Sequence, residues 1–185
     1  MPGFLAVMIC FLGSMLSADS AIDEKELLNR ANQTLQHLKN RDFKKLSQYV
    51  HKDVTFSPNA SVDKNAVKFT AAKLKSLKLT EKFTWGSYDG SGEPILLSVA
   101  DYFKKYVCDQ DFVKAPQIRV DALIKTGNTL SNIDKVFPNA HFVEYHFPGF
   151  NPEYEGIDWV SLRLLFEKTD GEWTLVGVVH DAWSI

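Results

Sequence analysis

The chain of 185 residues has only two cysteines, Cys10 and Cys108. Cys10 lies in an N-terminal apolar segment, so a mature chain without that segment has one cysteine and no intramolecular disulfide. The hydrophobic core must therefore hold the fold by itself. Cys108 follows Phe103, Tyr106 and Val107, whose helical spacing favours a buried, unreactive thiol over a nucleophile.

The sequence also lacks an excess of positive charge. Its formal net charge is -2, with 21 Lys and Arg against 23 Asp and Glu. A basic surface is the usual electrostatic signature of nucleic-acid binding, so nucleic acid is disfavoured as a partner. Hydrophobic residues make up 45% and charged residues 24%, as in globular proteins, and no repeat or interior linker divides the chain. We therefore expect a single domain.

Short motifs of the common enzyme classes are missing as well. No His-x-His, Cys-x-x-Cys or His-Glu-x-x-His spacing offers a zinc site, no Gly-x-Ser-x-Gly marks a serine hydrolase, and there is no phosphate loop. Asp89, Ser91 and Glu93 alternate with glycines like the start of a calcium loop, but Ala100 stands where the bidentate Glu belongs. A Gly-rich turn explains the stretch without metal, so we expect no cofactor, and these three residues are weak metal candidates.

The longest apolar run extends from Phe4 to Leu16 and precedes a stretch of small residues. A bilayer core needs about 20 apolar residues, whereas a shorter run followed by small residues is typical of a secretory signal peptide. We interpret residues 1–21 as a signal peptide and expect the protein to be secreted or held in the cell envelope. An uncleaved anchor is the alternative, because no Lys or Arg precedes the run. Lipidation at Cys10 is weakly supported, because the small residue that usually precedes a lipidated cysteine is absent.

The first half of the mature chain predicts helices. A stripe of apolar residues gives an amphipathic helix from Asp23 to Leu38; its members are Leu27, Leu28, Ala31, Leu35 and Leu38. Asp42 can cap a second, short helix. The Lys-rich segment 63–82 is expected to be a helix or an irregular arm. Ser98 and Asp101 resemble a capping box that opens a helix reaching about Val107.

The second half predicts strands. Short strands are expected at 54–56, 118–124 and 142–147, with a Gly-rich loop over 85–95. The chain ends in two β-type runs, 156–166 and 173–185, which flank a turn at 169–172 and predict a long hairpin. Helices at the front and strands at the back predict an α+β fold, with N-terminal helices packed on a curved, mainly antiparallel sheet.

Beyond this pattern, certain segments carry a more specific signal. They are Trp85-Gly86, Asp89-Gly90-Ser91-Gly92, Tyr102-Phe103, Asp111-Phe112, Gly127-Asn128-Thr129, Asn132-Ile133, Glu144-Tyr145-His146-Phe147-Pro148-Gly149, Gly156, Asp158-Trp159, Ser161-Leu162-Arg163-Leu164, His180-Asp181 and Trp183. Together they resemble a family of uncharacterised bacterial secreted proteins and lipoproteins with a nuclear transport factor 2-like (SnoaL-like, cystatin-related) domain. The resemblance implies a cone-shaped sheet in one domain over residues 22–185, and it brings no known activity.

Polar residues on or beside the last two strands are the candidates for catalysis. Asp158, His180 and Asp181 would line a cone able to hold a small ligand or an acid–base pair. Because side chains alternate along a strand, His180 and Asp181 point to opposite faces unless a bulge intervenes. We favour a structural role, in which His180 hydrogen-bonds a carboxylate or a carbonyl.

Four further residues are candidates for ligand binding: Glu144, His146, Arg163 and Trp183. Glu144 and His146 share one strand face, which we expect to be a solvated edge; facing inward they would add an acid and a base to the pocket. A buried Arg163 would need a carboxylate partner or would receive an anionic ligand, and an exposed Arg163 on the outer sheet fits equally well. Trp183 is expected to face the surface, and the other tryptophans to fill the core.

These observations predict an exported, non-catalytic ligand-binding or protein-interaction module at the cell envelope. Its partner would be a small molecule or an envelope protein, a homodimer is compatible with the sequence, and only an uncleaved N-terminal segment would contact membrane. The alternative is a small-molecule hydrolase or isomerase in which His180 works with Asp158 or Asp181. An enzyme requires His180 within hydrogen-bond reach of a carboxylate in a cavity, whereas a module requires a filled cone and an exposed aromatic patch.

Overall fold

The computed structural model describes the backbone of residues 13–183 and the side chains of residues 23–183. Helix α1 (Gly13–Lys39) confirms the predicted amphipathic helix and begins earlier, inside the segment that we interpret as a signal peptide. Most of the apolar run, with Cys10, lies outside the described residues. In the described part of the chain, no helix is long and apolar enough to cross a membrane.

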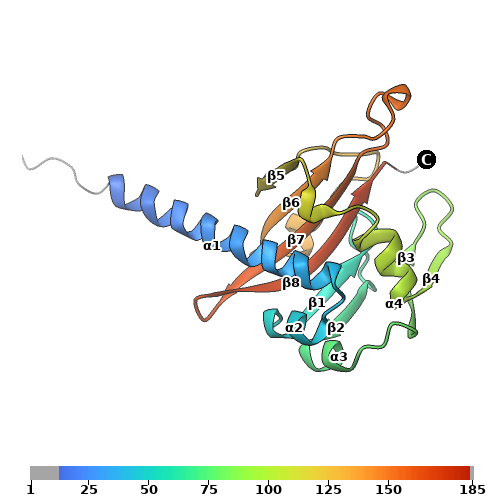
Figure 1. The fold of residues 1–185 in the computed structure, drawn as a ribbon, viewed down its shortest axis with the longest axis horizontal. Helices are drawn as coiled ribbons and strands as arrows, with labels where there is room; N and C mark the ends of the chain where they lie inside the picture. The colour runs from blue at the N-terminus through green and yellow to red at the C-terminus, as the bar shows by residue number, and fades with distance from the viewer. Residues whose placement is uncertain (1–12, 184–185) are drawn as a thin grey trace, which may run out of the picture.

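The main sheet has six strands in the order β2-β1-β8-β7-β6-β5. The strands are β1 (Asp53–Ser57), β2 (Val67–Thr70), β5 (Gln117–Val120), β6 (His141–Phe147), β7 (Val160–Thr169) and β8 (Glu172–Ala182). Every neighbouring pair is antiparallel except β1 and β8, which are parallel. Helix α1 crosses one face of this curved sheet, and its first turns extend beyond it (Figure 1). The predicted α+β architecture is confirmed.

Strands β7 and β8 form the predicted terminal hairpin. Asp170 and Gly171 take positive φ values of 52° and 83°, which suit the two-residue turn whose twist matches the flanking strands. In the register of this pair, Ser161 lies opposite Asp181 and Leu162 lies opposite His180. The two neighbours His180 and Asp181 therefore point to opposite faces of the sheet, as the alternation predicts.

Both faces of the sheet are buried. On one face, the stripe of α1 packs in the main core with residues that lie side by side on β6, β7 and β8: Val143, Leu164 and Val178. A second apolar cluster joins Leu165 and Val179 to Ile133, on the short helix α5 (Ile133–Val136). The sheet register puts Leu165 and Val179 on the opposite face, so the segment after β5 covers the side that α1 leaves open.

Several local predictions are confirmed. Asp42 caps α2 (Phe43–Leu46) by accepting the Lys45 N–H at 3.1 Å, and η1 (Ser47–Tyr49) continues this turn. Ser98 caps α4 (Val99–Tyr102), and a π-helical turn, η2 (Phe103–Val107), follows it directly. Two 3-10 turns, η3 (Phe112–Lys114) and η4 (Pro152–Tyr154), lie in the later connections.

Three predicted boundaries are wrong. Segment 63–82 contains strand β2 and the short helix α3 (Ala71–Ser76), because the run Val67 to Thr70 pairs with β1. The predicted loop 85–95 overlaps a hairpin of β3 (Lys82–Ser87) and β4 (Pro94–Ser98), and its irregular part is the turn over residues 88–93. The strand predicted at 118–124 ends at Val120, because Asp121 turns the chain with a φ of 51°.

Candidate functional site

Two groups of polar side chains lie at one end of the β7–β8 hairpin, on opposite faces of the sheet. One group surrounds Arg163 and lies under the segment that follows β5. The other surrounds His180 and lines a cavity. The alternation of side chains along β8 separates them, because Asp181 belongs to the first group and His180 to the second.

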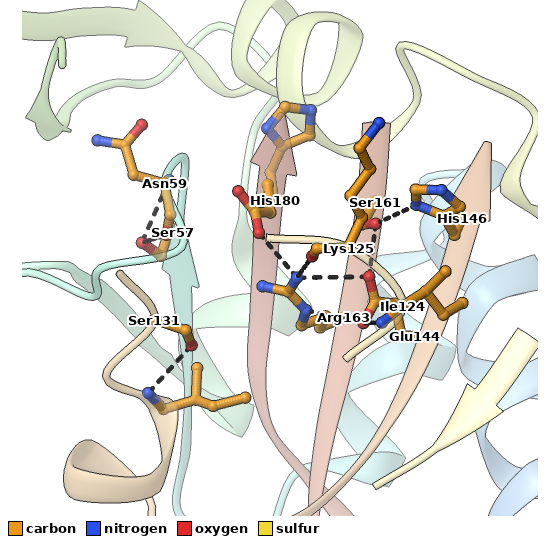
Figure 2. Close-up of polar contacts among 12 residues, drawn as sticks. Ser57, Asn59, Ile124, Lys125, Ser131, Glu144, His146, Ser161, Arg163 and His180 are labelled. Carbon is orange, nitrogen blue, oxygen red and sulfur yellow. Dashed lines mark hydrogen bonds and ion pairs between the residues drawn. The ribbon is translucent and has the colours of Figure 1, made fainter. Parts of the chain in front are cut away.

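Arg163 is the centre of the first group. Its Nε lies 3.2 Å from Glu144 Oε2, and its Nη2 lies 3.3 Å from Glu144 Oε1 and 2.7 Å from Asp181 Oδ2. The side chains of Arg163 and Glu144 are fully buried, and that of Asp181 is only 4% exposed. Figure 2 shows Arg163 and Glu144 on neighbouring strands. The expectation that a buried Arg163 needs a carboxylate partner is confirmed.

Ser161 and His146 extend this network. The Ser161 hydroxyl donates to Glu144 Oε1 at 2.6 Å, and His146 Nδ1 lies 2.8 Å from the Ser161 oxygen. Since the single hydroxyl proton goes to Glu144, His146 Nδ1 must carry the proton that it donates to Ser161. Burial lowers the pKa of His146, with Glu144 acting in the opposite direction, so the neutral ring is favoured.

The prediction that Glu144 and His146 form a solvated edge is therefore wrong. Their relative exposures are 0% and 1%. The physical reason is a segment distant in sequence: the Ile124 N–H donates to Glu144 Oε2 at 3.1 Å, and Arg163 Nη2 donates to the Lys125 carbonyl at 3.3 Å. The network holds this segment against the sheet with a single guanidinium between two carboxylates. Burial raises the pKa of Asp181, and the nearby Arg163 opposes that rise.

The second group is built around His180. Its Nε2 lies 3.2 Å from Asp109 Oδ2, and its Nδ1 lies 3.3 Å from the Pro58 carbonyl oxygen. Both ring nitrogens thus face acceptor atoms, and these two contacts orient the ring. The Tyr106 ring packs edge-on against the imidazole, at 5.4 Å between centroids. In Figure 2 the imidazole of His180 lies above Arg163 and its partners.

His180 lines a cavity of about 300 Å³. Its other walls come from the connection after β1, the β3–β4 turn, η2 and the segment around residue 129; the residues with side chains suited to recognition are Asn59, Tyr88, Asp89, Lys105, Tyr106, Thr129 and Trp183. Lys105 Nζ lies 3.3 Å from the Tyr88 hydroxyl and over the Tyr88 ring at 4.6 Å. The Thr129 hydroxyl donates to Asp89. The cavity therefore combines aromatic faces with charged and hydroxyl groups.

Asp158 lies elsewhere, in the loop before β7. Its Oδ2 accepts the backbone N–H groups of Asn151 at 2.8 Å and of Phe150 at 3.0 Å, and these bonds lower the pKa of the carboxyl. Among the described residues, the carboxylate within hydrogen-bond reach of His180 is that of Asp109. The pairing of His180 with Asp158 or Asp181 is therefore replaced by a pairing with Asp109.

The remaining candidates divide between surface and turn. Trp183 is 44% exposed, as predicted, and contributes to the lining of the His180 cavity. Ser91 Oγ accepts the Glu93 N–H at 3.3 Å within the β3–β4 turn, and Glu93 is exposed. In the part of the chain that the structure describes, no group of three or more His, Cys, Asp or Glu side chains could hold a metal ion.

Sequence reasoning missed Asp109, Lys105 and Tyr88 as site residues. Asp109 lies 71 positions before His180, and no periodic pattern links the two. The helical spacing of Phe103 and Tyr106 predicted burial for Tyr106 but not its contact with His180. The Gly-rich turn that carries Tyr88 and Asp89 was the available signal, because such loops often present side chains to ligands.

Comparisons with known proteins found similar solved structures but no family. No protein-family model matches the chain, and no curated protein does. Two solved structures are similar: an NTF2-like (nuclear transport factor 2-like) protein with a cystatin-like fold from Novosphingobium aromaticivorans and an NTF2-like protein of unknown function from Shewanella baltica. The first is 9% identical, with a TM-score of 0.44 over 95% of this chain and 92% of the other. The second is 10% identical, with a TM-score of 0.36 over 86% and 93%.

Proposed function

We propose that this protein is a ligand-binding module that holds a small molecule in the cavity around His180. The observation that carries the proposal is the cavity itself, in which one histidine, one lysine and several aromatic rings converge from three separate parts of the chain: the β3–β4 turn, η2 and the end of β8. Its volume of about 300 Å³ lies at the lower end of the range for small-ligand pockets, roughly 300–1,000 Å³.

The walls of this cavity are held in place before any ligand arrives. The contacts with Asp109 and Pro58 fix the imidazole of His180. The Thr129 hydroxyl bonds to Asp89 and so holds the segment after β5 against the β3–β4 turn. Preorganised walls reduce the entropy lost on binding. A flat molecule with a hydrogen-bond acceptor suits the cavity, since Tyr88 and Trp183 offer ring faces and Lys105 offers N–H donors.

The proposal includes export to the cell envelope or beyond, as residues 1–21 suggest, and kinship with secreted proteins and lipoproteins. The support is the apolar run from Phe4 to Leu16 followed by small residues. Fractionation of the native host with an antibody against the chain tests it. A shortened chain outside the cytoplasm is expected; the full-length chain in the cytoplasm would contradict export.

Acid–base catalysis is the second candidate function. The specific observation that favours it is the His180–Asp109 pair at the cavity wall, because a carboxylate beside an imidazole orients the ring for proton transfer. His180 would then exchange a proton with the ligand, as in a small-molecule hydrolase or isomerase, with Asp109 in the role that we assigned to Asp158 or Asp181.

A fragment screen by ligand-observed NMR tests the binding proposal. We expect fragments that bind the purified chain and lose at least tenfold in affinity in Tyr88→Ala and Lys105→Met, whose side chains are exposed enough for the fold to persist. His51→Asn is the matched control, because His51 is an exposed histidine two residues before β1. Fragments that bind all variants equally would contradict the proposal. A substrate turned over by the wild type and not by His180→Asn would favour catalysis.

A further inference from the structure

The loop between β6 and β7, residues 148–159, exposes large apolar side chains. Phe150 is 50% exposed, Tyr154 is 55% exposed and Ile157 is 49% exposed. The loop extends past the end of the sheet, close to the C-terminal end of β8 (Figure 1). Trp183, 44% exposed, adds a ring from that end of the chain.

The backbone of this loop is tied down by hydrogen bonds. Asp158 accepts two backbone N–H groups, Asn151 Oδ1 accepts the Glu153 N–H at 3.0 Å, and Lys125 Nζ donates to the Gly156 carbonyl at 2.7 Å. Glu155 takes a left-handed conformation with a φ of 49°, which a non-glycine residue adopts at a cost. The loop therefore holds one shape while it leaves its apolar groups in solvent.

Tyr154, Ile157 and Trp183 line an open depression of about 630 Å³, together with Glu153, Glu155 and Asp158. We call these six residues the β6–β7 surface. Contiguous exposed apolar groups with a polar rim mark interaction sites on folded proteins. A rigid loop that displays them loses little conformational entropy when a partner binds.

The charges of the β6–β7 surface indicate the kind of partner. Glu153 and Glu155 are exposed, and no salt bridge of the described residues includes either of them. The nearby cation, Lys125, uses its Nζ on the Gly156 carbonyl. Carboxylates beside an apolar depression attract basic groups and repel phosphate-rich surfaces such as anionic lipid or nucleic acid.

We propose that the β6–β7 surface docks a peptide segment of a protein partner, in which an apolar anchor side chain is flanked by Lys or Arg. The anchor enters the depression between Tyr154, Ile157 and Trp183, and the basic residues lie against Glu153 and Glu155. This role goes beyond small-molecule binding at His180, and of the six residues of the β6–β7 surface only Trp183 also lines the His180 cavity. The two sites meet at Trp183, which also lines the His180 cavity, so a docked segment covers one wall of that cavity.

A random peptide library displayed on phage and selected on the full chain tests the proposal, with depletion on the Glu153→Lys/Glu155→Lys variant. We expect enriched peptides with an aromatic or aliphatic residue next to at least two basic residues. Synthetic copies should bind the wild type at least tenfold more tightly than the charge-reversed variant and Ile157→Ser. Leu96→Ser is the matched control, because Leu96 is 62% exposed on β4, and it should leave binding unchanged.

Acrylamide quenching gives an independent readout. Trp85, Trp159 and Trp173 are at most 5% exposed, so quenching of the native chain reports mainly on Trp183 and should fall when a selected peptide binds. His180→Asn should leave peptide binding intact, which separates this proposal from the proposed function. The absence of enriched peptides that depend on the surface, or enrichment without basic residues, would overturn it. A dimer that buries the surface, seen in sedimentation, would overturn it as well.

Discussion

Arg163 Nη2 lies 2.7 Å from Asp181 Oδ2, and the two side chains are buried on adjacent strands. Glu144 on β6 contacts the same guanidinium from the other side. One cation thus joins β6, β7 and β8 and anchors the segment after β5 through the Lys125 carbonyl. That segment contributes Thr129 to the His180 cavity, so the network positions one wall of the candidate binding site.

Replacing Arg163 with Met should destabilise the chain strongly. The substitution leaves Glu144 and Asp181 buried without their cation, and the loss of one partner of a buried ion pair costs about 3–5 kcal/mol. Urea unfolding of both proteins at neutral pH measures the difference. Arg119→Met on β5 is the control and should cost under about 0.5 kcal/mol, since Arg119 is exposed and, in the described part of the chain, donates to the neighbouring Ile118 carbonyl. A fall in the free energy of unfolding of less than about 1 kcal/mol for Arg163→Met would contradict a stabilising role of the network.

The free energy of unfolding should fall as the pH drops below about 6.5, partly because of His146. Its pKa is lowered in the folded chain, so the unfolded state binds more protons and the stability is lost as the pH falls through the unfolded pKa. Between about pH 7.5 and 5.5 the wild type should lose more stability than His146→Gln, because only the wild type carries the histidine with the lowered pKa. His51→Gln, an exposed histidine, should behave like the wild type. Equal losses in the wild type and His146→Gln would exclude this role.

Gly149→Ala should destabilise the β6–β7 loop. Gly149 has a φ of 143°, and an added Cβ would lie 2.8 Å from Asp158 Oδ1 and 2.9 Å from Gly156 Cα. Asp158 is held by two backbone N–H groups, so we expect a cost of about 1–3 kcal/mol in thermal unfolding and weaker binding at the β6–β7 surface. Gly92→Ala is the matched control, since its φ is also positive, at 70°, but nothing lies within 4 Å of its Cβ. If Gly149→Ala and Gly92→Ala destabilise the protein equally, the cost comes from the positive φ and not from the contact with Asp158.

Cys108 should react slowly with a thiol reagent. Burial raises the pKa of its thiol, which lowers the fraction of reactive thiolate near neutral pH. In a Cys10→Ser chain, the rate of labelling at about pH 8 should rise at least tenfold when urea unfolds the protein. The same rate in the native and unfolded chains would show that the native thiol is accessible and ionised, contrary to the expectation from the sequence.

The sequence was most informative for elements whose side-chain pattern is set locally. The stripe from Leu27 to Leu38 predicted α1, and the apolar runs around 169–172 predicted the hairpin, because turn residues and β-type residues act locally. It was least informative for the short strand β2 in the Lys-rich segment 63–82, because the structure of this strand depends on pairing with β1. The same limit applied to Glu144 and His146, whose face is covered by a distant segment.

The sequence by itself determined that Glu144 and His146 share a face, that Ser161 and Arg163 share a face, and that His180 and Asp181 point to opposite faces, because alternation along a strand is a local property. Only the tertiary structure decided that the face of Arg163 is buried and that His180 meets Asp109. Burial of a strand face depends on which remote segment packs over it, and a contact across 71 positions leaves no periodic trace in the chain.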